Sequence, residues 1–272
     1  MIGERSRNAS WPFISKPAYR KVDRGYMKQA NQPLADQASR QRKAQKILAV
    51  LAQQTQFDLG KLNCVDIGCA YGLISQHLAA RFRFTLGIEY ERNALVLARP
   101  LAHSHLAFMQ ADACQLPLPA DSVDVVVCAQ VYEHVYNDGL LFVEIWRVLK
   151  PGGLCFFSGP NRLFPYEYHW RLLFVHWLPR RWSQSLAQRI ARKPVAELHL
   201  RTYWSLKRAL ARFQLTDYTA EMIRHPERYA LDDSLHRLSW LRRLPAAILR
   251  RLVILAPNFN WVLTKPVNGP VR

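Results

Sequence analysis

Acidic residues recur at a regular spacing in the first half of this sequence. Asp66, Glu89 and Asp112 each follow an apolar run typical of a buried strand, and 23 residues separate each acid from the next. Because the carboxyl ends of parallel strands meet at one edge of a sheet, we expect the three carboxylates to share one crevice. One such acid is as often a helix cap or a solvated loop residue. Three in register favour a ligand site.

The spacing of these acids also indicates what the ligand contains. A carboxylate about 20 residues past a glycine turn can accept hydrogen bonds from both hydroxyls of a ribose, which is the role expected for Glu89. Asp112, at the end of the next strand, is placed to meet an adenine amino group. Asp66 would repel a pyrophosphate but not a cationic cofactor.

The first acid stands just before a turn of small residues, Gly68-Cys69-Ala70-Tyr71-Gly72. Glycine permits the tight turn and lets a ligand press against backbone N–H groups at the start of the next helix. The competing interpretation, a dinucleotide site, requires Gly-x-Gly-x-x-Gly, but Leu73 stands where the third glycine would be. The turn therefore favours an adenosyl cofactor that carries positive charge.

The hydrophobic pattern predicts the sheet that would position these residues. Helices and strands alternate in the centre of the chain, and such alternation is typical of a parallel sheet with both faces covered. We predict the fold class α/β, a Rossmann-like, doubly wound, mainly parallel seven-stranded sheet with helical N-terminal and C-terminal additions. The expected strands are 62–67, 84–89, 105–109, 123–129, 154–158, 215–223 and 261–264, and the expected helices are 40–54, 72–82, 91–101, 137–149 and 202–213.

Composition divides the chain into three expected regions. Residues 1–40 lack periodicity and form an irregular basic arm, residues 41–160 form the cofactor-binding domain, and residues 161–272 form a basic, aromatic substrate or lid region that completes the sheet. The net charge is +18, and the last region alone holds 20 Lys or Arg against 7 Asp or Glu, a balance of +13. Such asymmetry indicates an anionic partner.

Five motifs, in one order, resemble the class I S-adenosylmethionine-dependent methyltransferases. The resemblance is greatest to the small-molecule branch that includes ubiquinone and menaquinone biosynthesis enzymes, and it covers about residues 45–160. The motifs are Val65-Asp66-Ile67-Gly68-Cys69-Ala70-Tyr71-Gly72; Glu89; Asp112-Ala113; Leu116-Pro117-Leu118-Pro119 before Asp121-Ser122-Val123-Asp124-Val125-Val126; and Glu133-His134-Val135 with Leu149-Lys150-Pro151-Gly152-Gly153.

The resemblance implies a methyltransferase (EC 2.1.1.-) whose cofactor is S-adenosyl-L-methionine. Asp66, Gly68 and Gly72 would line its methionine end, Glu89 would hold the ribose, and Asp112 with Ala113 the adenine. Gln130 would lie at the cofactor's far side. The remaining residues assigned to the cofactor are Cys69, Ala70 and Tyr90. The chain departs from the family at Ala70, where Gly is usual, and at Tyr71, where a small polar residue is usual.

Methyl transfer from a sulfonium requires alignment of the acceptor and exclusion of water, and a base only if the acceptor begins protonated. His134 is the candidate base, with a structural histidine as the alternative. Glu133 is a weaker candidate. After the fifth strand, Tyr166, Glu167 and His169 could contact the acceptor or merely pack in a lid. We predict no metal site.

The flanking regions combine Arg with Trp, Leu and Pro at 170–182 and 240–252. We favour docking at an anionic membrane surface, because the aromatics lie among Leu, Ile and Val. The acceptor would then be a small molecule or lipid-linked, and the enzyme cytoplasmic or peripheral at the inner membrane face. RNA methylation is the alternative, although nucleic acid fits these flanks less well. A helical lid with a solvated basic face and a non-catalytic scaffold also stay open.

The remaining features fit a cytoplasmic protein. The five cysteines, an odd number with no CxxC pair, lie in or beside apolar runs and are expected to be reduced and buried. Neither a signal peptide nor an apolar run long enough to span a bilayer is recognisable.

Overall fold

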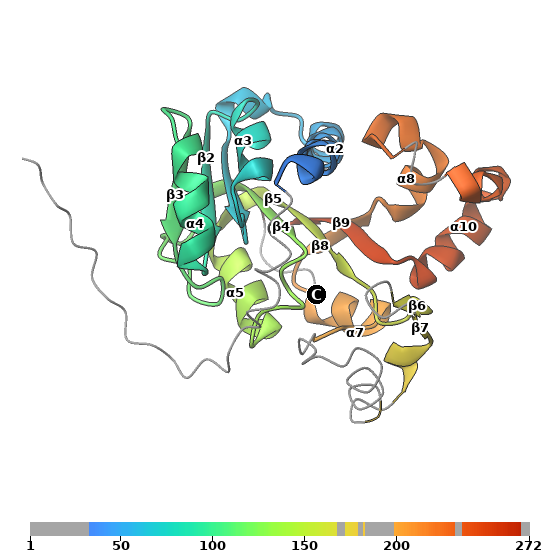
Figure 1. The fold of residues 1–272 in the computed structure, drawn as a ribbon. Helices are drawn as coiled ribbons and strands as arrows, with labels where there is room; N and C mark the ends of the chain where they lie inside the picture. The colour runs from blue at the N-terminus through green and yellow to red at the C-terminus, as the bar shows by residue number, and fades with distance from the viewer. Residues whose placement is uncertain (1–32, 168–171, 179–181, 183–198, 232–235, 268–272) are drawn as a thin grey trace, which may run out of the picture.

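The computed structural model describes residues 33–167, 172–178, 182, 199–231 and 236–267 (Figure 1). Within them, a seven-stranded sheet has the order β3-β2-β1-β4-β5-β9-β8. The first five strands in this order are mutually parallel, whereas β9 is antiparallel to both of its neighbours. The strands are β1 (Asn63–Ile67), β2 (Phe84–Glu89), β3 (Leu106–Gln110), β4 (Val123–Ala129), β5 (Leu149–Pro160), β8 (Gln214–Asp217) and β9 (Asn258–Thr264).

Helices cover both faces of the sheet, and the predicted doubly wound fold is confirmed. On one face, α2 (Pro33–Gln54), α3 (Leu73–Ala79) and α8 (Thr219–Arg224) pack on side chains such as Val125 and Phe156. On the other, α5 (Asp138–Val148) and α7 (Tyr203–Ala209) pack on side chains such as Val126 and Phe157. Consecutive residues of β4 thus face opposite layers, and both layers exclude water from them.

The helix boundaries differ from the expected ones for local reasons. α2 begins at Pro33, well before Arg40, so part of the expected irregular arm is helical; proline suits the first turn of a helix because its missing N–H is not needed there. The expected helix 91–101 divides at Pro100 into α4 (Arg92–Ala98) and a 3-10 turn, η3 (Arg99–Leu101). In the last region α7 starts at a capping box between Thr202 and Ser205.

The strand expected at 215–223 is wrong in its second half. β8 stops at Asp217, whose Oδ1 accepts a hydrogen bond from the N–H of Thr219 at 2.8 Å, and α8 follows at once. The chain then passes through η5 (Pro226–Tyr229), η6 (His236–Arg243), α10 (Ala246–Leu252) and η7 (Val253–Leu255) before β9. This insertion between the last two strands forms the end of the molecule beyond β8 (Figure 1).

Candidate cofactor site

The glycine turn lies at the carboxyl edge of the sheet, beside the ends of β2 and β4. Ile67 pairs with Ile88 on one side and with Cys128 on the other. Beyond it, the N–H groups of Gly68 and Cys69 both donate to the carbonyl of Ile88, at 2.8 and 3.1 Å. The turn is thereby held against β2, and the next N–H along the chain, that of Ala70, donates to Glu89.

Three residues of the turn take the left-handed conformation, with φ of +71° at Gly68, +49° at Ala70 and +75° at Gly72. Two of these positions also lack space for a side chain. A Cβ on Gly68 would lie 2.6 Å from Val131, and one on Gly72 would lie 2.5 Å from Phe108. Only Ala70 carries a Cβ in this conformation, which glycine adopts at less cost.

Glu89, at the end of β2, is hydrogen-bonded through both carboxylate oxygens. Oε2 accepts from the N–H of Ala70 at 2.8 Å, and Oε1 accepts from the N–H of Glu91 at 2.9 Å. A carboxylate has about four lone-pair sites, so each oxygen can accept a further bond from a ligand hydroxyl. The two backbone bonds orient the carboxylate and connect it to the turn.

Asp66, at the end of β1, is 4% exposed, and Ser75 of α3 donates its hydroxyl to Oδ2 at 2.6 Å. Burial, with a smaller contribution from nearby Glu89, raises the pKa of Asp66 to about 7, although the bond from Ser75 opposes the rise. A cation bound beside Asp66 and Glu89 would stabilise the ionised form of Asp66. Ser75 was not among the predicted residues; its signal was a polar residue one helical turn past the glycine turn.

Asp112 follows β3 and forms a tight turn, in which its Oδ1 accepts from the N–H of Cys114 at 2.8 Å. Ala113 is half-buried within this turn. The exposed Tyr90 lies near: burial and the charge of Asp112 raise the pKa of its phenol. The ends of the three neighbouring strands β1, β2 and β3 therefore carry the three acids, as the spacing predicted.

Comparison with known proteins agrees with this geometry. A family profile described as a methyltransferase domain matches residues 65–157, which run from β1 through β5. Residues 65–157 belong to a class I S-adenosylmethionine-dependent methyltransferase domain.

Relatives and solved structures extend the similarity of the methyltransferase domain. A probable S-adenosylmethionine-dependent methyltransferase of Mycobacterium tuberculosis is 35% identical over 99 residues, 36% of this chain and 36% of the relative. A ubiquinone biosynthesis O-methyltransferase of Pseudomonas putida is 31% identical over 104 residues, 36% of this chain and 44% of the relative. The matches thus span less than half of these curated relatives.

A methyltransferase crystal structure from Mesorhizobium loti covers 81% of this chain and 97% of its own, with a TM-score of 0.54 and 20% identity. One from Listeria monocytogenes, described as putative, covers 82% and 98%, with a TM-score of 0.51 and 17% identity. At these identities the likeness concerns the fold, which is the Rossmann-like fold expected from the sequence.

Gln130 follows β4, which lies next to β1 on the side away from β2 and β3. It has a φ of +62°, and its N–H donates to the carbonyl of Ser158 at 2.7 Å. Its side-chain amide donates to Oδ1 of Asn258 at 3.2 Å. Gln130 therefore turns toward β5 and β9.

His134 and Glu133 lie four and three residues past Gln130. The imidazole is 44% exposed, and its Nε2 lies 3.8 Å from Oε1 of Glu133. Burial raises the pKa of Glu133 to about 8, and its Oε2 has no hydrogen-bond partner within the described part of the chain. Glu133 is thus a buried carboxyl that favours its neutral form at pH 7, whereas His134 is accessible from solvent.

The predicted acceptor residues fall at the edge of the described chain. Tyr166 is half-buried and pairs with Leu173 between the short strands β6 (Tyr166–Glu167) and β7 (Leu172–Leu173). The backbone of Glu167 belongs to β6, but its side chain and the whole of His169 lie outside the described residues.

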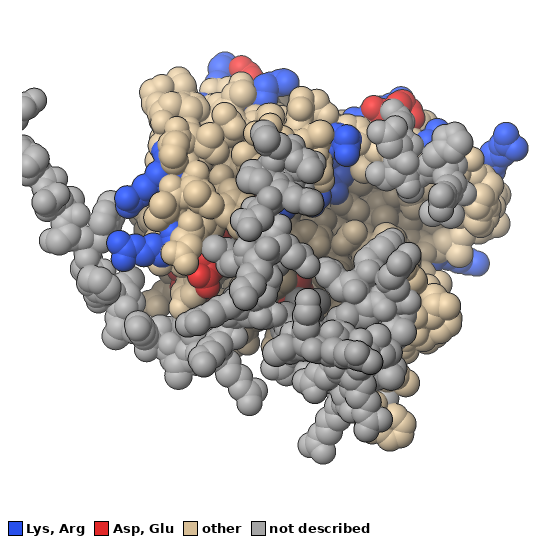
Figure 2. All heavy atoms as spheres, viewed as in Figure 1, with Lys and Arg blue, Asp and Glu red and all other residues tan. Residues whose placement is uncertain are grey.

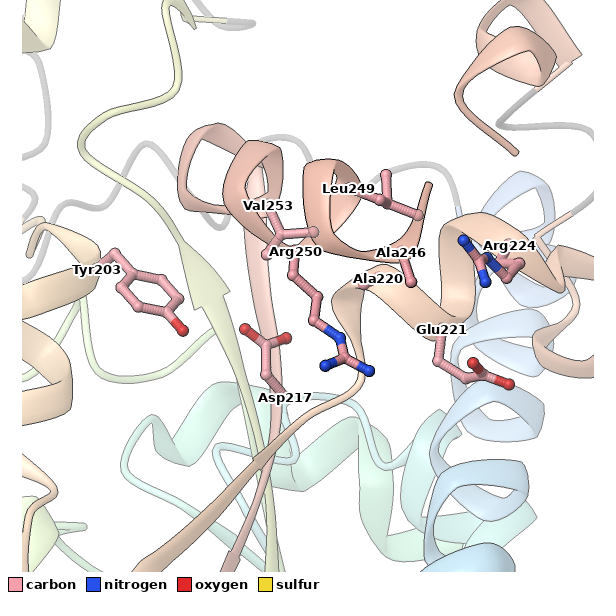
Figure 3. A pocket seen from close by; sticks show the side chains of 9 residues that line it. All are labelled: Tyr203, Asp217, Ala220, Glu221, Arg224, Ala246, Leu249, Arg250 and Val253. Carbon is pink, nitrogen blue, oxygen red and sulfur yellow. The ribbon is translucent and has the colours of Figure 1, made fainter. Parts of the chain in front are cut away.

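Two further features were missed from the sequence. Arg201 forms a two-pronged ion pair with Asp138 at the start of α5, and this pair ties the last region to the methyltransferase domain. A hollow of about 310 Å³ lies past the carboxyl end of β8 (Figure 3), where the side chain of Arg250 reaches in from α10. Its lining is Tyr203, Asp217, Ala220, Glu221, Arg224, Ala246, Leu249, Arg250 and Val253.

The hollow lies apart from the predicted site, because β4, β5 and β9 separate β8 from β1 in the sheet. No group of three or more His, Cys, Asp or Glu side chains suited to a metal ion occurs among the described residues. In that same part of the chain, no helix combines the length and apolarity that crossing a bilayer requires.

Proposed function

We propose that this protein transfers a methyl group from S-adenosylmethionine to a small-molecule or lipid-linked acceptor, and that it does so at an anionic membrane surface. The observation that carries the cofactor half of the proposal is the bond network around Glu89, which joins a ribose-type carboxylate to the N–H of Ala70 in the glycine turn. The membrane half of the proposal rests on the surface of the insertion between β8 and β9.

The cofactor residues would divide the adenosyl group among three strand ends. Asp66 would meet the positively charged methionine end, together with the backbone of Gly68, Cys69, Ala70 and Gly72. Glu89 would accept the ribose hydroxyls, and Asp112, Ala113 and Tyr90 would bound the adenine. When bound, the cofactor supplies an activated methyl group, and the protein has to align the acceptor and keep water out.

His134 is the residue we assign to proton removal. Its imidazole follows the fourth strand, as Gln130 does, and it is exposed, so an acceptor hydroxyl could reach it. Burial raises the pKa of neighbouring Glu133 to about 8, so that carboxyl favours its neutral form at pH 7. An imidazole is a suitable base for a phenol or hydroxyl.

The membrane half of the proposal rests on a surface that we call the insertion face. Apolar side chains stand exposed beside arginines on η6, α10 and η7, and Figure 2 shows Arg or Lys projecting at this end of the molecule. Interleaved arginines and apolar side chains on short helices suit the plane of an anionic bilayer. The insertion face consists of Trp240, Arg243, Ile248, Arg251, Leu252 and Leu255.

Flotation with vesicles tests this half. The protein should float with phosphatidylglycerol vesicles and not with phosphatidylcholine vesicles, and Leu252→Ser with Arg251→Glu should weaken flotation at least tenfold. Lys61→Glu, a charge reversal of equal size on η2 (Leu59–Lys61), is the matched control. Binding to RNA without flotation would instead support the alternative, an RNA methyltransferase.

Transfer itself is tested with S-adenosylmethionine labelled in its methyl group. A lysate divided into lipid, RNA and small-molecule fractions serves as the acceptor source. Label in the lipid or small-molecule fraction supports the proposal, and label in RNA alone rejects it. Binding of the cofactor without label in any fraction would favour a non-catalytic scaffold.

A further inference from the structure

A polar group is set into the apolar face of the sheet near the carboxyl ends of β4 and β5. Its centre is Lys46 of α2, whose ammonium donates to Oδ1 of Asn260 in β9 at 3.0 Å. The same ammonium lies 5.9 Å from the ring centroid of Phe156. Ser158 donates its hydroxyl more weakly to the same oxygen of Asn260, at 3.4 Å. Aliphatic and aromatic side chains of the core surround this group on the sheet side.

The strand register places this group at the level of the predicted site. Asn260 pairs with Ser158, and Ser158 pairs with Ala129, the last residue of β4. Gln130, the next residue, donates its N–H to the carbonyl of Ser158. Lys46 therefore reaches the sheet at the carboxyl ends of β4 and β5, where the crevice opens.

The strand order separates Lys46 from the adenosyl residues. Asn260 lies on β9, the third strand from β1 in the direction away from β2 and β3. With neighbouring strands about 4.8 Å apart, the centre of the group is roughly 14 Å from the strand that ends in Asp66. A ligand group at Lys46 thus belongs to the acceptor rather than to the cofactor's adenosyl portion.

The charge of Lys46 is uncompensated within the described chain. It forms no ion pair with any carboxylate described, and Asn260 occupies one of its three N–H donors. Burial, with a smaller contribution from Lys43, lowers the pKa of the ammonium to about 8. A half-buried cation with only a neutral amide and an aromatic ring beside it is costly, and an anion beside it would lower that cost.

We propose that Lys46, with Asn260 and Ser158, binds an anionic oxygen group of the acceptor, a carboxylate or a phosphate. The inference rests on the proposed function and specifies its substrate class: the acceptor carries negative charge at one end, bound at Lys46. Its methylated atom lies toward β4, on the side of Gln130 and His134.

Calorimetry on the full chain tests this site with three probes: benzoate, inorganic phosphate and dihexanoyl phosphatidic acid. We expect the wild type to bind at least one of them, and Lys46→Met to weaken that binding at least tenfold. The probe that binds distinguishes a carboxylate, a free phosphate and a lipid phosphate. The matched control, Lys61→Met, removes a lysine from the turn before β1 and should bind as the wild type does.

A second variant keeps the test decisive if Lys46→Met does not fold. Asn260→Asp places a carboxylate against Lys46 and should compete with the probe, so its binding should also fall at least tenfold. The proposal is overturned if no probe binds the wild type, or if either folded variant binds as tightly as the wild type.

The affinity for S-adenosylhomocysteine, measured on the same samples, should be unchanged by Lys46→Met. A matching loss would overturn the proposal by making Lys46 a cofactor residue. Failure of the wild type to bind S-adenosylhomocysteine would contradict the cofactor proposal instead. Because the probe titrations contain no S-adenosylhomocysteine, a failure of the cofactor site can be distinguished from a failure of the anion site at Lys46.

Discussion

The N–H of Ala70 donates to Oε2 of Glu89 at 2.8 Å, which joins the glycine turn after β1 to the acid that ends β2. The donor is held in the left-handed conformation, and the acceptor's other oxygen is occupied by the N–H of Glu91. The two bonds orient the carboxylate expected to hold the ribose, and the bond from Ala70 connects that carboxylate to the turn.

Replacing Glu89 should weaken the cofactor site more than the fold. Glu89→Gln keeps one acceptor oxygen but loses the charge and the second acceptor, and hydrogen bonds to charged groups contribute about 1.5–3 kcal/mol. We expect the affinity for S-adenosylmethionine to fall about 10- to 100-fold in calorimetric titration. Glu91→Gln is the matched control, since the carboxylate of Glu91 neighbours the site without a predicted role in it. Equal effects of the two variants would contradict the assignment.

Ala70 should be strained in a way that glycine relieves. A residue with a Cβ at φ of +49° costs roughly 1–2 kcal/mol, partly offset by the greater chain entropy of glycine. Ala70→Gly should therefore leave the free energy of unfolding unchanged or raise it by up to about 1 kcal/mol, as measured by urea denaturation. Ala80→Gly, at an ordinary φ of −69°, should lower it by about 0.5–1 kcal/mol. Destabilisation by both variants would show that Ala70 is not strained.

Binding of S-adenosylmethionine should weaken in acid because of Asp66. Burial raises its pKa from 3.8 to about 7, and a cation favours the ionised carboxylate, so the pKa in the complex is lower. Below pH 7 the free protein is protonated at Asp66 and must lose that proton to bind. Affinity should fall up to about tenfold per pH unit between pH 7 and 5.5. Asp66→Asn should bind more weakly at pH 8 and show a flatter profile. An unchanged slope in the variant would assign the titration to another group.

The carboxyl of Asp66 should also affect the stability of the free protein. Its ionisation favours binding of the cofactor at high pH but lowers the free energy of unfolding there. The folded pKa of Asp66 lies above its unfolded value, so the free protein favours the protonated carboxyl. Its contribution to the free energy of unfolding is therefore present below about pH 4 and is lost as the pH rises to about 7. In thermal melts at pH 8, Asp66→Asn should melt at or above the temperature of the wild type. A lower melting temperature would indicate that Asp66 has a cation partner in the free protein.

Removing the imidazole of His134 should affect turnover and not cofactor binding. His134→Ala should lower kcat about 10²- to 10⁴-fold on the acceptor found by labelling, the range typical of a general base. The Kd for S-adenosylmethionine should be unchanged, because the imidazole follows β4, whereas the three acids lie at the ends of β1, β2 and β3. His105→Ala, at the amino end of β3, is the control. Unchanged kcat in His134→Ala would remove the residue from the mechanism.

Much of the fold could be predicted from the sequence because its pattern is local. The β-branched run at 123–129 must be buried on both faces, and the acids at strand ends mark the register of β1, β2 and β3. The glycine turn was recognisable despite Ala70, because Gly68 and Gly72 remain glycine. At both positions φ is positive and neighbouring side chains leave no space for a Cβ. Each of these signals lies within a few residues of the feature it predicts.

What could not be predicted depends on contacts between distant segments. Lys46 and Asn260 are 214 residues apart, and their bond exists because β9 returns antiparallel beside β5. Arg201 and Asp138 likewise meet only after α7 packs near α5. The end of β8 was missed because Asp217 bonds to the N–H of Thr219 and starts a helix in a segment whose apolar residues also suit a strand.

The central claim is that this crevice binds S-adenosylmethionine through the acids at three strand ends. Calorimetric titration of the full chain with S-adenosylmethionine at pH 8 tests it most directly. We expect one site per chain with a Kd of about 1–100 μM. The double variant Asp66→Asn with Glu89→Gln should give only background heat while it stays folded by circular dichroism. No heat in the wild type, or equal affinity in the double variant, would contradict it.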